Sequence, residues 1–196
     1  TIVIEEDRSL IGYNTDGPGF LAHLTELNVS FKGKRVAILG AGGTTRAILA
    51  ILCLLPEGPE SVHIYNRTPE KLTALIKDMG SRMDVKMIHP ARTIDDLELG
   101  SCDILINTTS VGLKKEDPCL ISEELIHPKM FVYDVIYNPV QTKLLKLAEK
   151  KGAKTSNGLG FLFYQGVLAF QHWADAQLDE KVKKKMRSTL EKAVHL

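Results

Sequence analysis

Three glycines between an apolar run and a helical pattern could bind a diphosphate. Residues 36–39 form a β-branched apolar run, as expected of a parallel strand that is buried on both faces. Gly40, Gly42 and Gly43 follow at once and lead into an apolar helical pattern. Free N–H groups and the helix dipole at such a turn stabilise a diphosphate. An ordinary turn is the alternative, but the flanking strand and helix favour a nucleotide site.

The third position of this G-x-G-x-x-G fingerprint departs from the usual pattern. It holds Thr45, where Gly or Ala is common. A small residue at this position lets the helix pack closely on the strand. We therefore expect the helix and the strand to be less closely packed here.

Cationic residues follow the second predicted strand of the sheet, residues 61–65. In a dinucleotide-binding sheet the end of this strand faces the adenine ribose, where NAD proteins tend to carry Asp or Glu. Here Arg67 stands at that point, with Thr68 beside it and Lys71 one turn later. Cations and hydrogen-bond donors at this corner favour a 2′-phosphate, hence NADP. A solvated helix start with incidental charges is the alternative.

Small polar residues end the fourth predicted strand, residues 103–108. Thr108 and Ser110 lie at its carboxyl end, and Gly112 follows. This end of a strand is where the ligand of an open α/β sheet binds, so Thr108 and Ser110 are candidates for the cofactor site. A plain loop is the alternative.

Asp16 is a carboxylate at the start of another helical pattern. It precedes Gly17 and Pro18, and Phe20 and Leu24 lie on one face of the pattern. From its position alone we expect Asp16 to cap this helix, with Pro18 in the first turn.

The elements that would position these residues alternate between strands and helices. Such alternation predicts an α/β fold, a doubly wound parallel six-stranded sheet of the Rossmann type with strand order 3-2-1-4-5-6. Two extra helices end the chain. Residues 1–158 are expected to form the dinucleotide-binding domain with its lead-in segment, and residues 159–196 the C-terminal helices. The predicted elements are a hairpin at 2–4 and 10–13, strands at 36–39, 61–65, 85–88, 103–108, 130–135 and 153–156, and helices at 47–55, 71–79, 141–150, 161–176 and 179–195.

Composition excludes several classes of function. With 196 residues, 44% apolar and 25% charged, the chain is large enough for a full core. A net charge of +1 gives no field that would attract nucleic acid or an anionic membrane, and no apolar run reaches the ~18 residues of a membrane span. Residues 1–5 do not resemble a targeting peptide, and three scattered cysteines form no disulfide framework. A cytoplasmic protein without a metal site is expected.

Six segments, in this order, resemble the shikimate dehydrogenase family. They cover nearly the whole chain and comprise residues 12–17, 40–47, 66–68, 107–112, 133–139 and 157–160, the last followed by Gln165. The resemblance implies an oxidoreductase of the chorismate pathway in aromatic amino-acid biosynthesis. Its reaction would be NADP-dependent hydride transfer between 3-dehydroshikimate and shikimate.

The resemblance also implies roles for individual residues. Asp16 corresponds to the catalytic carboxylate, which works beside a lysine. The substrate contacts would be Thr15, Tyr137 and Gln165. The cofactor residues would hold the diphosphate, surround the 2′-phosphate or lie near the nicotinamide, and comprise Gly40, Ala41, Gly42, Gly43, Thr44, Asn66, Arg67, Thr68, Lys71, Thr108, Ser110, Val135 and Gly158.

The chain departs from the family in one respect that concerns activity. The family has an N-terminal α/β domain that carries the catalytic lysine and most substrate contacts, and no lysine here occupies a matching motif. We expect a truncated chain that binds NADP and is nearly inactive alone. The apolar helix from Phe161 to Trp173 would then favour a homodimer or a swapped assembly. The alternatives are a non-catalytic NADP-binding sensor module and another NADP-linked Rossmann dehydrogenase of the methylene-tetrahydrofolate type.

Overall fold

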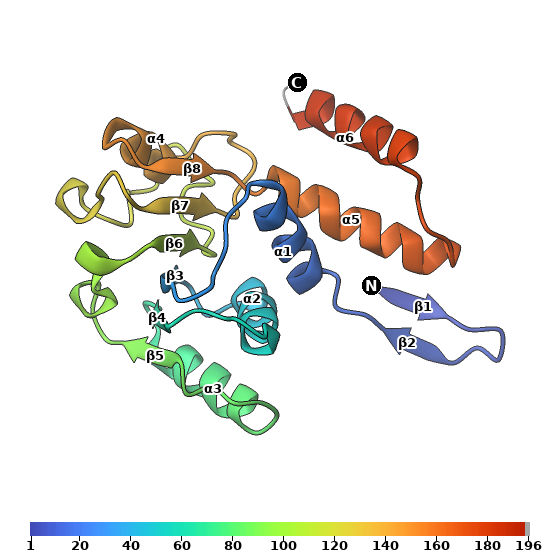
Figure 1. The fold of residues 1–196 in the computed structure, drawn as a ribbon, viewed down its shortest axis with the longest axis horizontal. Helices are drawn as coiled ribbons and strands as arrows, with labels where there is room; N and C mark the ends of the chain where they lie inside the picture. The colour runs from blue at the N-terminus through green and yellow to red at the C-terminus, as the bar shows by residue number, and fades with distance from the viewer. Residues whose placement is uncertain (195–196) are drawn as a thin grey trace.

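Six parallel strands form the central sheet of the computed structural model, which describes residues 1–194 (Figure 1). The strand order is β5-β4-β3-β6-β7-β8, the expected 3-2-1-4-5-6 arrangement. The chain reverses direction across the sheet between β3 and β6, which is the switch point at which such sheets bind ligands. The strands are β3 (Arg35–Leu39), β4 (Ser61–Tyr65), β5 (Ile88–Ala91), β6 (Ile104–Asn107), β7 (Phe131–Asp134) and β8 (Lys154–Ser156).

Helices cover both faces of this sheet. One face packs against α1 (Asp16–Glu26), α2 (Gly43–Leu54), α3 (Pro69–Gly80) and α5 (Leu159–Ala174). The other packs against α4 (Lys143–Lys150) and the 3₁₀ turns η1 (Asp95–Leu97) and η2 (Leu99–Ser101). Side chains of β3 alternate between the two cores, since Val36 and Ile38 face the first and Ala37 and Leu39 the second. The doubly wound fold is therefore confirmed.

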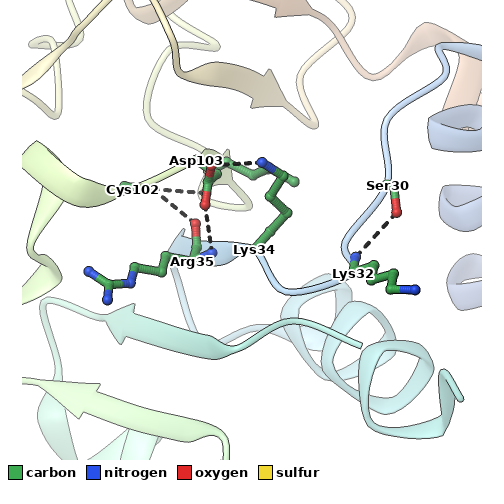
Figure 2. Close-up of polar contacts among 7 residues, drawn as sticks. Ser30, Lys32, Lys34, Arg35, Cys102 and Asp103 are labelled. Atoms are coloured by element: carbon green, nitrogen blue, oxygen red, sulfur yellow. Dashed lines mark hydrogen bonds and ion pairs between the residues drawn. The ribbon is translucent and has the colours of Figure 1, made fainter. Parts of the chain in front are cut away.

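Polar contacts fix the amino ends of β3 and β6 relative to each other (Figure 2). The Asp103 carboxylate accepts hydrogen bonds from the Arg35 backbone N–H and from Lys34 Nζ, both at 2.9 Å. The Asp103 N–H in turn donates to the Arg35 carbonyl at 2.9 Å. These bonds fix the register of the two central strands at their amino ends, opposite the carboxyl ends where the switch point lies.

A two-stranded hairpin precedes α1 and lies beside the C-terminal end of α5 (Figure 1). Strands β1 (Ile2–Ile4) and β2 (Leu10–Gly12) pair antiparallel, as expected. The Tyr13 ring stacks on His172 with ring centroids 3.9 Å apart, and Trp173 Nε1 donates to the Ile2 carbonyl at 2.9 Å. The hairpin is thus fixed to α5 rather than to the sheet.

Some element bounds differ from expectation. The strand expected at 85–88 is wrong, because residues 85–88 form a turn closed by the Ile88 N–H on the Val85 carbonyl at 2.9 Å, and β5 begins at Ile88. This strand contains Pro90, which is tolerated because β5 lies at the sheet edge. A 3₁₀ turn, η3 (Glu123–Leu125), lies between β6 and β7.

The last helix, α6 (Glu180–Val194), has no buried residue. Arg187 of this helix forms an ion pair with Glu26 of α1 at 2.6 Å. The expected end of this helix at His195 lies outside the described residues. No helix within residues 1–194 has the length and apolar content required to span a bilayer.

Candidate functional site

The glycine turn joins the carboxyl ends of three adjacent strands. Gly40 follows β3 with a φ of +114°, a conformation that side chains with a Cβ rarely adopt. Its N–H donates to the Tyr65 carbonyl at the end of β4, at 2.8 Å. A Cβ at Gly40 would lie 2.5 Å from Oγ1 of Thr108, which follows β6. Glycine is therefore required here by both conformation and space.

The start of α2 presents free backbone donors to open space. Gly42 immediately precedes the helix, and a Cβ at Gly42 or Gly43 would meet no atom within 4 Å. Within residues 1–194, the N–H groups of Gly43 and Thr44 have no hydrogen-bond acceptor. A helix N-terminus with unpaired N–H groups binds anions, so this arrangement suits a diphosphate.

A groove of about 480 Å³ connects the glycine turn to α3. Arg46 of α2 pairs with Asp78 of α3 on this groove. Lys71 of α3 also lines the groove, and among the described residues it forms no ion pair. The complete lining is Ala41, Gly42, Gly43, Arg46, Lys71, Ala74, Leu75 and Asp78.

The residues after β4 lead into α3, which lines this groove. Arg67 is exposed and, in the part of the chain that the structure describes, forms no ion pair. Asn66 Nδ2 donates to the Thr68 carbonyl at 2.8 Å, which shapes the turn into α3. Thr68 stands at the N-cap of α3 and Pro69 in its first turn. A phosphate bound near Arg67 and Lys71 would meet two uncompensated cations.

Two fully buried polar residues, Asn107 and Asp134, connect the ends of β6 and β7. Asn107 Nδ2 donates to Asp134 Oδ1 at 3.0 Å, and its Oδ1 accepts from the Thr109 N–H at 3.0 Å. Asp134 also accepts from Thr142 Oγ1 at 2.8 Å and from the Ile136 N–H at 3.1 Å. Burial raises the pKa of Asp134, while these hydrogen bonds oppose the shift. The sequence reasoning assigned neither residue a role, although each ends an apolar strand with a polar side chain.

Val135 and Gly158, both expected near a nicotinamide, lie in contact. The Gly158 N–H donates to the Ile136 carbonyl at 3.1 Å. A Cβ at Gly158 would lie only 1.9 Å from the Val135 carbonyl oxygen. The loop after β7 and the start of α5 can approach this closely only because residue 158 is glycine.

Helix α1, which begins at Asp16, packs against both α2 and α5. The backbone of Gly17 approaches Ala47, the fifth residue of α2, since a Cβ at Gly17 would lie 2.9 Å from the Ala47 carbonyl. Gly19 packs against the backbone of Gln165 on α5. The first turn of α1, with Asp16, therefore lies close to the helix that begins at the glycine turn, and Gln165 lies beside α1.

Asp16 does not cap this helix. It is the first residue of α1, Thr15 stands at the N-cap position, and Asn14 Oδ1 accepts the Gly17 N–H at 3.0 Å. The expected capping role is wrong because Asn14, two residues earlier, supplies the acceptor. The carboxylate of Asp16 has no hydrogen-bond or ion-pair partner within residues 1–194.

Two expected ligand residues remain on exposed loops. Tyr137 follows β7 and is 37% exposed. Ser110 lies in the exposed part of the loop after β6. Among the described residues, neither side chain forms a hydrogen bond with Thr15, Asp16 or Gln165. Helix packing brings Gly19 of α1 against Gln165 of α5, so Asp16 and Gln165 lie on two helices that pack together.

A buried histidine, which the sequence reasoning did not single out, attaches α1 to the sheet. His23 Nδ1 is 2.8 Å from the hydroxyl of Tyr133 on β7. A Cβ at Gly160 would lie 2.2 Å from His23 Nε2, so the imidazole packs directly on the first turn of α5. Burial lowers the pKa of His23 to about 4, and the ring is neutral at pH 7.

A parallel sheet of this order, with a glycine turn at its switch point, defines a Rossmann-like α/β protein. Residues 23–131 match the family described as shikimate / quinate 5-dehydrogenase. The chain belongs to this family.

Individual relatives support the same assignment. The chain is 40% identical over 173 residues to a shikimate dehydrogenase (NADP(+)) of Geobacillus kaustophilus, covering 87% of this chain and 61% of the relative. It matches Thermus thermophilus shikimate 5-dehydrogenase, solved with NADP(H) and shikimate, with a TM-score of 0.78 and 30% identity over 95% of this chain and 66% of the other. A quinate dehydrogenase of Corynebacterium glutamicum, solved with NAD, gives a TM-score of 0.82 and 26% identity over 97% and 66%.

NAD(P) binding is therefore typical of the family, and members differ in which dinucleotide they hold. The chain spans less than two thirds of the length of these relatives.

Proposed function

We propose that this chain is the cofactor-binding part of an NADP-dependent shikimate dehydrogenase. The observation that carries the proposal is the open start of α2 at the glycine turn, on a groove that Lys71 also lines, with Arg67 two residues after β4. Within residues 1–194 neither cation forms an ion pair. Unpaired N–H groups match a diphosphate, and the two cations match a 2′-phosphate. Relatives that are named or solved with NADP support the same cofactor.

The proposed cofactor site follows the carboxyl ends of the strands. Gly40 to Gly43 and Thr44 would hold the diphosphate, Asn66 to Thr68 and Lys71 the 2′-phosphate, and Val135 and Gly158 the nicotinamide side. Thr108 and Ser110 would line the loop between them. When bound, NADPH supplies the hydride that reduces a ketone.

Asp16 would act on the proton rather than the hydride. Reduction of a ketone leaves negative charge on its oxygen, so a positioned acid must supply a proton. In the family pattern that acid is a lysine paired with the carboxylate equivalent to Asp16. The carboxylate at the start of α1, which has no partner within residues 1–194, is available for such a pair. Thr15, Gln165 and Tyr137 would contact 3-dehydroshikimate.

These 196 residues alone would bind the cofactor without appreciable turnover. Within the described residues, no lysine forms an ion pair or hydrogen bond with Asp16, so the proton donor of the proposed pair is not among its contacts. In the same proposal, residues 159–196 would pack on an N-terminal substrate domain like that of the family. Without it, exposed apolar side chains on α5 would favour self-association.

The cofactor proposal is tested by calorimetric titration of the chain with NADP⁺ and NAD⁺. Tighter binding of NADP⁺ is expected, because only its 2′-phosphate meets Arg67 and Lys71. Binding of neither dinucleotide would contradict the proposal.

The reaction is tested by mixing the chain with a separately produced N-terminal part of a family member. NADPH oxidation by 3-dehydroshikimate is expected only in the mixture and is expected to be lost with Asp16→Asn. Cofactor binding without any turnover in the mixture would instead favour a sensor module.

A further inference from the structure

A chain of hydroxyl groups lies directly beneath the glycine turn. Thr45 Oγ1 accepts the Gly42 N–H at 3.2 Å and lies 2.8 Å from Thr108 Oγ1. Thr108 Oγ1 in turn donates to the Leu39 carbonyl at 2.7 Å. The Thr45 side chain is fully buried. These contacts connect the start of α2 with the ends of β3 and β6.

The direction of each hydrogen bond follows from the first and last members. A hydroxyl has one proton, and that of Thr108 goes to the Leu39 carbonyl, so Thr108 must accept from Thr45. Thr45 therefore donates to Thr108 and accepts from the Gly42 N–H. Each donor in this chain therefore has an acceptor: Gly42 N–H donates to Thr45, Thr45 to Thr108, and Thr108 to the Leu39 carbonyl. Consecutive hydrogen bonds of this kind strengthen one another.

This chain of hydrogen bonds from Gly42 through Thr45 and Thr108 to Leu39, called the relay below, determines which backbone N–H groups remain available to a ligand at the glycine turn. The Gly42 N–H is committed to Thr45, whereas the N–H groups of Gly43 and Thr44 have no acceptor among the described residues. The relay thus fixes the residue before α2 against the end of β3 and leaves the next two donors free. The hydroxyl of Thr45 accordingly has a specific role at a position where Gly or Ala is usual in the fingerprint.

We infer that Thr45 is a positioning residue for the diphosphate of the dinucleotide, acting through Thr108 and Gly42 on the free N–H groups of Gly43 and Thr44. This inference rests on the proposed cofactor function. It concerns only the part of the ligand that NADP and NAD share. Thr45 should therefore affect the affinity for both dinucleotides equally, unlike the cations at the ribose corner.

The test compares Thr45→Val, which keeps the shape and removes the hydroxyl, with Thr45→Ser, which keeps the hydroxyl. Dissociation constants are measured by calorimetry for NADP⁺, NAD⁺ and adenosine 2′-monophosphate, which lacks the diphosphate. In Thr45→Val we expect the constants for NADP⁺ and NAD⁺ to rise by the same factor, about tenfold, as for one buried hydrogen bond. The constant for adenosine 2′-monophosphate should stay unchanged, and Thr45→Ser should bind all three like the parent chain.

A double-mutant cycle with Thr108→Val separates a relay from two independent contacts. Because breaking either link interrupts the relay, the double variant should bind NADP⁺ no more weakly than the weaker single variant. Additive losses would overturn the inference, as would unchanged dinucleotide binding in Thr45→Val or an equal loss for adenosine 2′-monophosphate. If Thr45→Val does not fold, Thr45→Ala removes the hydroxyl with a smaller side chain, and unchanged dinucleotide binding in Thr45→Ala would overturn the inference. A parent chain that binds none of the three probes would instead refute the proposed function.

Discussion

Gly158 shows how a single missing methyl group sets the shape of the site. An added Cβ would lie 1.9 Å from the Val135 carbonyl oxygen, which is backbone and cannot move aside. We therefore expect Gly158→Ala to lower the free energy of unfolding by about 3 kcal/mol, the upper part of the usual range for overpacking. Urea denaturation followed by circular dichroism measures this change.

A matched glycine provides the control. Gly166 lies inside α5, and a Cβ there would meet nothing within 4 Å. Gly166→Ala should stabilise the chain by about 0.5–1 kcal/mol through helix propensity. Equal effects of the two substitutions would show that contact with Val135 does not determine the cost at position 158.

Arg67 is expected to determine the choice between the two dinucleotides. Arg67→Asp replaces a cation with an anion that repels a 2′-phosphate and can accept a ribose hydroxyl. The ratio of the NAD⁺ to the NADP⁺ dissociation constant should fall by about tenfold or more, as for the loss of a charged hydrogen bond. Calorimetry with both ligands measures the ratio.

Lys77→Asp makes the same change of charge on an exposed residue of α3. It should leave the ratio unaltered, because Lys77 lies in the last turn of α3, at the end of the helix away from the turn that follows β4. If both variants changed the ratio equally, the effect would come from net charge rather than from a specific contact.

At the scale of elements, α1 depends on a buried histidine for its position. Burial lowers the pKa of His23 to about 4, below its ordinary value of 6.5. The unfolded chain therefore binds a proton between these pH values that the folded chain does not, so stability is highest above pH 6.5 and falls as the pH is lowered towards about 4. In His23→Gln the free energy of unfolding should depend less steeply on pH in this window.

Urea unfolding across that window is compared for the parent chain, His23→Gln and His89→Gln. The difference between the curves isolates one histidine, since carboxylates with lowered pKa, such as Glu26 beside Arg187, also lose stability in acid. His89 is exposed on the edge strand β5, so its substitution should keep the parental slope. A parental slope in His23→Gln would contradict the role given to burial.

Helix α6 relies on one arginine. Arg187 forms two hydrogen bonds with Glu26 of α1, at 2.6 and 2.8 Å, and its guanidinium lies 4.5 Å from the centre of the Phe163 ring. Since α6 has no buried residue, Arg187→Ala should release the helix while leaving the sheet intact.

Amide hydrogen exchange is expected to show faster exchange across α6 and unchanged protection in β3 and β6. Lys184→Ala, an exposed residue of the same helix without an ion pair among the described residues, should change neither. Similar acceleration in both variants would point to helix propensity rather than to the contact with Glu26.

Sequence predicts some of these elements better than others, for physical reasons. The central strands were predictable because burial on both faces demands uninterrupted apolar runs, as in residues 36–39. The edge strand β5 was misplaced because it needs no such run and contains His89 and Pro90. The glycine turn was visible because its signal is local, whereas Asn107 and Asp134 meet only after folding brings residues 27 positions apart together.

At the scale of the whole molecule, apolar side chains gather on the hairpin and the adjoining end of α5. Ile2, Ile4, Leu10, Phe170 and Trp173 are all exposed. An apolar surface of this kind favours association with another protein surface. We expect the chain to self-associate reversibly as its concentration rises, which sedimentation velocity measures.

A pair of leucines tests where this association occurs. Leu10 on the hairpin is 67% exposed and Leu54 at the end of α2 is 68% exposed. Leu10→Lys should shift the association to higher concentration, whereas Leu54→Lys should not. If the two substitutions acted alike, association would depend on overall apolar content rather than on the hairpin surface.

The contact between Trp173 and Ile2 makes tryptophan fluorescence a probe of the hairpin. The chain has one tryptophan, and its indole N–H donates to a carbonyl at the opposite end of the sequence. Its fluorescence therefore records detachment of the hairpin, while far-ultraviolet dichroism records melting of the sheet and its helices. If the fluorescence changes at a lower temperature than the dichroism, the hairpin detaches from α5 before the sheet and its helices unfold.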